Sequence, residues 1–84
     1  MSIIRSLFVV LSLAFASLAF AEININKADI EKLQELDGIG EAKAQAIVKH
    51  RETHGPFKSA QELAEVSGIG DKTVEKNKDE IIVE

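Results

Sequence analysis

The sequence predicts an all-α fold: one small domain of two helix–turn–helix units, preceded by a secretory leader. The tripeptide Gly-Ile-Gly occurs twice, at 38–40 and 68–70, in similar surroundings. Apolar residues of the body recur at the three- and four-residue spacing of helices. Alternation with period two, which is typical of strands, is hinted at only in 23–25 and 81–83. Residues 1–21 are largely apolar, as secretory leaders are.

Length, charge and cysteine content exclude several classes of function. A body of residues 22–84 buries only about 60% of its unfolded surface, which leaves no deep catalytic cleft between domains. The chain has no cysteine, so it has neither a disulfide framework nor a thiolate metal site. Its net charge is −4 and it has no strongly basic tail, so any nucleic-acid binding must come from local geometry. No nucleophile is spaced with a base, and we expect no enzyme activity.

The leader has the three parts of a signal peptide. Arg5 and the α-amino group make a short positive start, and residues 6–20 are uncharged. Ala19-Phe20-Ala21 fits the small-x-small cleavage pattern, with a weaker second match at 14–16. An uncleaved anchor is the alternative, but the uncharged stretch is shorter than the roughly 20 residues that span a bilayer. We therefore expect a signal peptide over 1–21 and a mature chain that begins at Glu22, outside the cytoplasm.

The body contains an internal repeat. Residues 33–44 (LQELDGIGEAKA) match residues 63–74 (LAEVSGIGDKTV) at a spacing of 30. Both copies carry leucine, glutamate, an apolar residue and Gly-Ile-Gly at equivalent positions, and an acidic residue follows each glycine pair. Two copies of one supersecondary unit explain this match.

The first unit spans residues 26–56. Asn26 to Asp29 resembles a capping box that opens a helix, and Ile30, Leu33 and Leu36 then fall on one face of it. After the turn at 37–40, a second helix is expected from Glu41 to about Thr53. His54-Gly55-Pro56 ends it, because Gly55 can adopt the left-handed conformation and proline blocks continuation.

The second unit repeats this plan. Ser59 to Glu62 forms a full capping box that opens the third helix, and the fourth helix is expected to start near Asp71. Asn77 occupies the position that Ile47 has in the first unit, so we expect the fourth helix to pack less well or fray there. The first hairpin should then contribute more to binding. The expected core is Leu33, Leu36, Ile39, Ala44, Ile47, Val48, Phe57, Leu63, Val66, Ile69 and Val74.

The Gly-Ile-Gly turns are the candidate binding sites. Their glycines can adopt positive φ and carry no Cβ, while the central isoleucine can fill the gap between the two helices. The N–H groups of Gly40, Glu41 and Ala42 project from a helix start, where donors lack partners and the dipole is positive, so they could bind a phosphate oxygen. Such a sequence also makes a simple turn between helices. Two copies, each followed by a lysine-bearing helix, favour phosphate binding.

These residues resemble a known family. LDGIGEAKAQAIVKHR resembles the helix-hairpin-helix motif, and the run from Asn24 to Thr73 is similar to the ComEA-type competence domain. The shared features are the opening N-x-N-x-A, the connector R-x-x-x-G-x-F (Arg51, Gly55, Phe57) and the second Gly-Ile-Gly. The resemblance covers essentially the whole body, and the leader is similar to that of the Gram-negative members.

The resemblance implies a fold, a function and partners. The fold is two tandem helix-hairpin-helix repeats in one compact SAM-like domain over 22–84. The function is binding of double-stranded DNA, without sequence specificity, through phosphates at the minor groove, during periplasmic DNA uptake in natural transformation. Other proteins of the uptake machinery are candidate partners; no cofactor is implied, although some members hold a monovalent cation on loop carbonyls. The expected DNA-binding residues are Gly38, Ile39, Gly40, Glu41, Ala42, Lys43, Gly68, Ile69, Gly70, Lys72, Thr73 and Lys76.

Three further points bear on this interpretation. His50 and His54 have the spacing of a metal pair on one helix face, but without a third ligand nearby we expect no metal site. Phe57 could stack on a base, although core packing is expected. The acidic body argues for modest DNA affinity and requires Lys43, Lys49, Lys72, Lys76 and Lys78 to gather on the hairpin side. The alternative function is a secreted protein-interaction module that uses an acidic helix face or the tail at 81–83.

Overall fold

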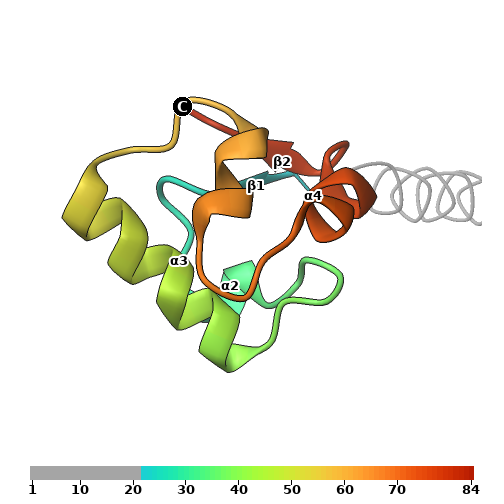
Figure 1. Cartoon of the computed structure of the whole chain (residues 1–84), viewed down its shortest axis with the longest axis horizontal. Helices are drawn as coiled ribbons and strands as arrows, with labels where there is room; N and C mark the ends of the chain where they lie inside the picture. Colours follow the sequence, from blue (N-terminus) through green and yellow to red (C-terminus); the bar gives the residue numbers. More distant parts are fainter. Residues whose placement is uncertain (1–21) are drawn as a thin grey trace, which may run out of the picture.

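The computed structural model describes residues 22–84, and the predicted signal peptide with its cleavage site lies outside the described residues. The fold is mostly helical, as the sequence predicts (Figure 1). In chain order the elements are β1 (Ile23–Asn24), α2 (Ile30–Leu33), α3 (Glu41–His54), the 3₁₀ helix η1 (Ala60–Glu65), α4 (Asp71–Asn77) and β2 (Ile81–Ile82).

Two short strands correct the expectation of a purely α fold. β1 and β2 pair in parallel, with Ile23 opposite Ile81 and Asn24 opposite Ile82 (Figure 1). Their pairing brings the two ends of the body together and buries Ile23, Ile25 and Ile81 in the core. The weak alternation of these two segments hinted at strands, but their pairing with each other is a long-range contact.

The predicted capping box at the start of the first helix is wrong. α2 begins at Ile30, and its N-cap is Asp29, whose side chain accepts a hydrogen bond from Lys32 N at 2.8 Å. Asn26 lies one turn earlier, where its own N–H is bound by the Asn24 side chain at 3.0 Å. The Asn26 side chain is thereby directed to a distant partner, the backbone of Phe57.

The second capping box is also wrong in its details. Ser59 is the N-cap of η1, but its side chain makes no capping hydrogen bond. Glu62 instead accepts a hydrogen bond from Lys58 N at 2.7 Å, one residue before the predicted partner. The segment is a 3₁₀ helix, with Glu62 N donating to Ser59 O at 3.2 Å, so its turn is tighter than that of an α-helix.

The long helix α3 confirms its prediction to within one residue. It runs from Glu41 to His54 and ends at Gly55, which has φ = 90° and donates its N–H to Arg51 O at 3.0 Å. Glycine adopts this backbone conformation without the steric penalty of a Cβ.

The core joins both units. Ten of the eleven predicted core residues are buried, and Val48 is partly buried against them. Ile39 and Ile69, which expose only 5% and 4% of their surface, fill the space beneath their turns as predicted. Phe57 is 3% exposed and its ring stacks on that of His50 at 5.1 Å, which confirms core packing. Ile23, Ile25 and Ile81 are the core residues that the helical pattern missed.

Candidate nucleic-acid interface

The two Gly-Ile-Gly turns have the same backbone geometry. Ile39 N donates to Leu36 O at 3.1 Å, and Ile69 N donates to Val66 O at 3.0 Å. The third residue of each turn, Gly38 or Gly68, has φ of 83° or 90°, while no non-glycine residue of the described chain has positive φ. These are the features of type II turns, which require φ > 0 at this position and therefore favour glycine.

The second glycine of each turn has a different role. Gly40 and Gly70 are the N-caps of α3 and α4, with extended φ values of −92° and −103°. The expectation of positive φ thus holds only for the first glycine of each pair. A Cβ added at Gly40 or Gly70 would meet nothing within 4 Å, so the backbone here is open to an approaching group.

Backbone donors are exposed at both helix starts. The first intrahelical hydrogen bonds run from Ala44 N to Gly40 O at 2.9 Å and from Val74 N to Gly70 O at 3.2 Å. The preceding N–H groups have no intrahelical acceptor, and neither N-cap has a side chain that could accept from them. Residues 40–42 and 70–72 are all exposed. Such donors, at the positive end of a helix dipole, can bind an anion.

Each turn lies against the start of the helix that follows the other turn. A Cβ on Gly38 would lie 3.8 Å from Thr73 Cγ2, and a Cβ on Gly68 would lie 3.8 Å from Lys43 Cγ and Cε. Gly38 and Gly68 are 30 residues apart, as are Lys43 and Thr73, so the two contacts are equivalents of each other. This is the relation that a two-fold axis between the turns would produce. It brings both helix starts to one side of the molecule.

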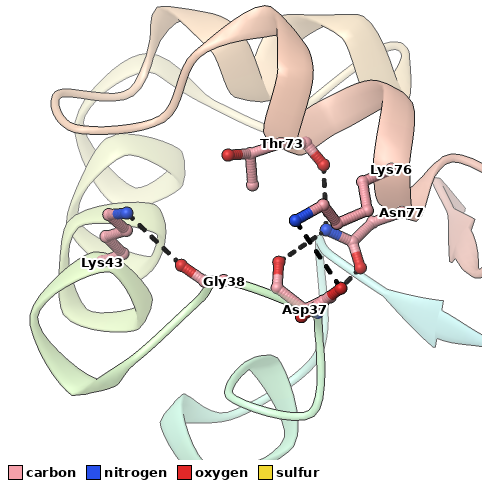
Figure 2. A network of polar contacts seen from close by, with 6 residues as sticks. All are labelled: Asp37, Gly38, Lys43, Thr73, Lys76 and Asn77. Atoms are coloured by element: carbon pink, nitrogen blue, oxygen red, sulfur yellow. Dashed lines mark hydrogen bonds and ion pairs between the residues drawn. The ribbon is translucent and has the colours of Figure 1, made fainter.

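Three of the five lysines that were expected to gather on the hairpin side lie at these turns. Lys43 Nζ donates to Gly38 O at 3.3 Å, and Lys76 Nζ is 3.8 Å from Asp37 Oδ2 (Figure 2). Lys72 is exposed on the first turn of α4 and makes no ion pair within residues 22–84. The requirement for a lysine cluster is therefore met in part.

The other two lysines lie elsewhere. Lys49 lines an open groove of about 340 Å³ between α3 and the segment 65–67. Lys78 forms an ion pair with Glu75 at 2.8 Å, and this hydrogen-bonded carboxylate raises the pKa of Lys78 above its usual value.

Acidic side chains flank both helix starts. Glu41 Oε2 accepts from Gln45 at 3.4 Å, and Asp71 Oδ1 accepts from Gln61 Nε2 at 2.9 Å. These exposed carboxylates stabilise the helix dipole. They also oppose a nearby phosphate, so the backbone amides and the lysines must outweigh them.

The prediction that α4 packs less well at Asn77 is wrong, although the helix does end at this residue. Asn77 is 3% exposed, and its side chain hydrogen-bonds both backbone groups of Asp37 and the carbonyl of Thr73 (Figure 2). The repeat alignment set asparagine against Ile47 and therefore suggested poor packing. The structure shows that the oxygen and both N–H groups of this side chain are hydrogen-bonded, which removes the reason to expect a weaker second hairpin.

The histidine pair forms an aromatic stack. The rings of His50 and His54 lie 4.3 Å apart, and His54 Nδ1 is 3.2 Å from His50 O. Residues 22–84 hold no group of three or more side chains placed to bind a metal ion. Nor does this part of the chain contain a helix long and apolar enough to cross a bilayer.

Comparison with known proteins identifies the family. A family model described as "Helix-hairpin-helix motif" matches residues 19–82. An uncharacterized protein of Haemophilus influenzae is 53% identical over 62 residues, which cover 73% of this chain and 55% of that protein. ComE operon protein 1 of Bacillus subtilis is 46% identical over 63 residues, covering 75% of this chain and 31% of the relative.

The same sequence also matches part of a larger animal protein. Endonuclease/exonuclease/phosphatase family domain-containing protein 1 of Homo sapiens is 46% identical over 61 residues, which are 73% of this chain and 11% of that protein. The matched region thus spans about half or less of each of these three relatives. The repeated turns, the buried isoleucines beneath them and these matches together show that the chain belongs to the helix-hairpin-helix family and is of the ComEA type.

Proposed function

We propose that this protein binds double-stranded DNA without sequence specificity, in DNA uptake during natural transformation. The observation that carries the proposal is the placement of two equivalent turns side by side, each with exposed backbone donors at a helix start. Two such sites can bind phosphates of one duplex at the same time. Likeness to ComE operon protein 1 supports the connection with competence.

The proposed contacts are those of the two hairpins. Backbone N–H groups of residues 40–42 and 70–72 bind phosphate oxygens, and Lys43, Lys72 and Lys76 add positive charge. Backbone contacts to phosphate carry no sequence information. The two hairpins are proposed to be tandem copies of the motif within one SAM-like domain over 22–84.

The negative net charge is compatible with this mode of binding. At physiological salt, charges separated by more than about 8 Å are largely screened. The amides of the helix starts act at hydrogen-bond distance, where screening is weak. Distant acidic residues therefore lower the affinity without preventing contact.

A periplasmic location is part of the proposal. It depends on the signal peptide expected over residues 1–21. Intact-mass analysis of the exported protein tests it: a chain that begins at Glu22 supports cleavage after Ala21. A full-length chain held in the membrane contradicts cleavage.

The alternative function, a protein-docking module, had two candidate surfaces: an acidic helix face and the tail at 81–83. The tail is not a suitable docking surface. Ile81 is buried in the core as part of β2, and Ile82 and Val83 are partly buried. The C-terminal tail is therefore part of the fold and does not present an apolar docking strip.

Fluorescence anisotropy with two unrelated duplexes tests the proposal. If each hairpin binds about two or three phosphates, log K should fall against log salt with a slope near −4 to −5, equally for both duplexes. A strong preference for one duplex, or affinity that does not respond to salt, contradicts the proposed mode of binding.

A further inference from the structure

Asn77 is the single buried polar or charged residue among residues 22–84. Its Oδ1 accepts from Asp37 N at 2.8 Å, and its Nδ2 donates to Asp37 O at 2.8 Å and to Thr73 O at 2.9 Å. Both donors of the carboxamide and its oxygen are therefore satisfied. Figure 2 shows this side chain reaching from α4 to the turn that contains Asp37.

The bonds of Asn77 join the two hairpins. Asp37 is the second residue of the turn from Leu36 to Ile39 and directly precedes Gly38, whereas Asn77 is the last residue of α4. The two residues are 40 positions apart. A neighbouring ion pair, Lys76 with Asp37, links the same segments, but both side chains are mostly exposed and such pairs contribute little.

The equivalent position in the first unit has no such link. Ile47 replaces Asn77 there, and Ser67 replaces Asp37. Ile47 is fully buried, so an aliphatic side chain can fill this kind of position in the fold. Unlike an aliphatic side chain, asparagine makes directional hydrogen bonds, and these fix the orientation of the Asp37 backbone relative to α4.

We infer that Asn77 is a positioning residue that fixes the first hairpin relative to the second, so that both bind phosphates of one duplex at once. This inference rests on the proposed function. When two sites are held in a fixed geometry, contact at one site raises the effective concentration of the ligand at the other, and the overall affinity increases. This gain in affinity is lost when the geometry prevents simultaneous contact. This role explains why only one of the two repeats carries asparagine at this position, because a single pair of hydrogen-bonded segments is enough to set the spacing of the two hairpins.

The test uses Asn77→Ile, which introduces the residue of the first unit, and Asn77→Ala, which is smaller and favours a helix. Ile81→Val is the matched control, since it perturbs the core at β2, away from the hairpins. Thermal melts followed by circular dichroism give the temperature at which each variant begins to unfold. Anisotropy is measured below that temperature at several salt concentrations.

We expect both Asn77 variants to lose on the order of tenfold or more in affinity. Their salt slope should become about two units shallower, because one hairpin with two or three phosphates no longer engages. Ile81→Val should keep a slope within about one unit of the original. Amide hydrogen exchange of the unmodified protein adds a reading that needs no variant: the Asp37 amide should be protected to the level of the amides within α4.

Several results overturn the inference. They are folded Asn77 variants that retain the original slope and affinity, an Ile81→Val variant that loses as much slope as they do, and an Asp37 amide that exchanges like an exposed loop. Failure of the proposed function is distinct, because it is seen as absence of salt-dependent DNA binding in the unmodified protein. In that case both ideas fall together.

Discussion

The side-chain amide of Asn26 pairs with both backbone polar groups of Phe57. Phe57 N donates to Asn26 Oδ1 at 2.7 Å, and Asn26 Nδ2 donates to Phe57 O at 3.0 Å. Nearby, Arg51 Nη1 donates to Ile25 O at 2.9 Å. These bonds attach the segment that follows β1 to the connector between the two units. They give a structural role to the N-x-N opening and to the R-x-x-x-G-x-F connector.

Replacing Asn26 by alanine is expected to destabilise the fold by about 2 kcal/mol. The substitution removes two hydrogen bonds and leaves the N–H and C=O of Phe57 without this partner. Urea unfolding followed by circular dichroism measures the change. Gln34→Ala is the control, because Gln34 is exposed and its side chain makes no hydrogen bond within residues 22–84. Equal stability of the two variants contradicts the role assigned to Asn26.

Replacing Ile39 or Ile69 by alanine is expected to cost about 2–5 kcal/mol, since each substitution leaves a cavity beneath its turn. Such a loss threatens a domain whose total stability is of the order of 5 kcal/mol. Thermal unfolding measures it, and Val48→Ala, at a partly buried position, should cost less. If both isoleucine variants melt with the original protein, neither side chain supports its turn.

The glycines of each turn should separate stability from binding. Gly38→Ala and Gly68→Ala place a Cβ on a residue with positive φ, at a cost of about 1–3 kcal/mol. Gly40→Ala and Gly70→Ala should cost about 1 kcal/mol or less, because these residues are extended and the space around them is open. In these two the new Cβ stands where a phosphate is proposed to approach, so DNA affinity should fall.

Gly55→Ala is the control for the glycine series. Gly55 has φ = 90° at the far end of α3, so its replacement should reduce stability while leaving DNA affinity unchanged. Unchanged affinity in folded Gly40→Ala and Gly70→Ala variants contradicts amide contacts at the hairpins.

Lys43→Ala and Lys72→Ala should each weaken binding equally for two unrelated duplexes and make the salt slope shallower by about one. The reason is that each removes a positive charge beside a hairpin. Lys49→Ala is matched in charge but lies about 12 Å along α3 from its first residue, and should change the slope little. Anisotropy across a salt series measures the three slopes. If the slopes of Lys43→Ala and Lys72→Ala are no shallower than that of Lys49→Ala, Lys43 and Lys72 do not contact phosphate.

The sequence by itself determined the features that depend on local spacing. The repeat, the two turns, the extent of α3 and the isoleucines beneath the turns all follow from glycine conformation and helical periodicity. These demands act between residues a few positions apart, so they can be recognised without knowing the fold.

Tertiary structure decided which distant groups meet. β1 pairs with β2 from the opposite end of the body, and Asn26 and Asn77 find backbone partners 31 and 40 residues away. An asparagine side chain can cap a helix nearby or pair with a distant backbone, and local spacing cannot distinguish these outcomes because both satisfy the same donors and acceptors. Only the packing of the two hairpins against each other determined which backbone groups came within reach.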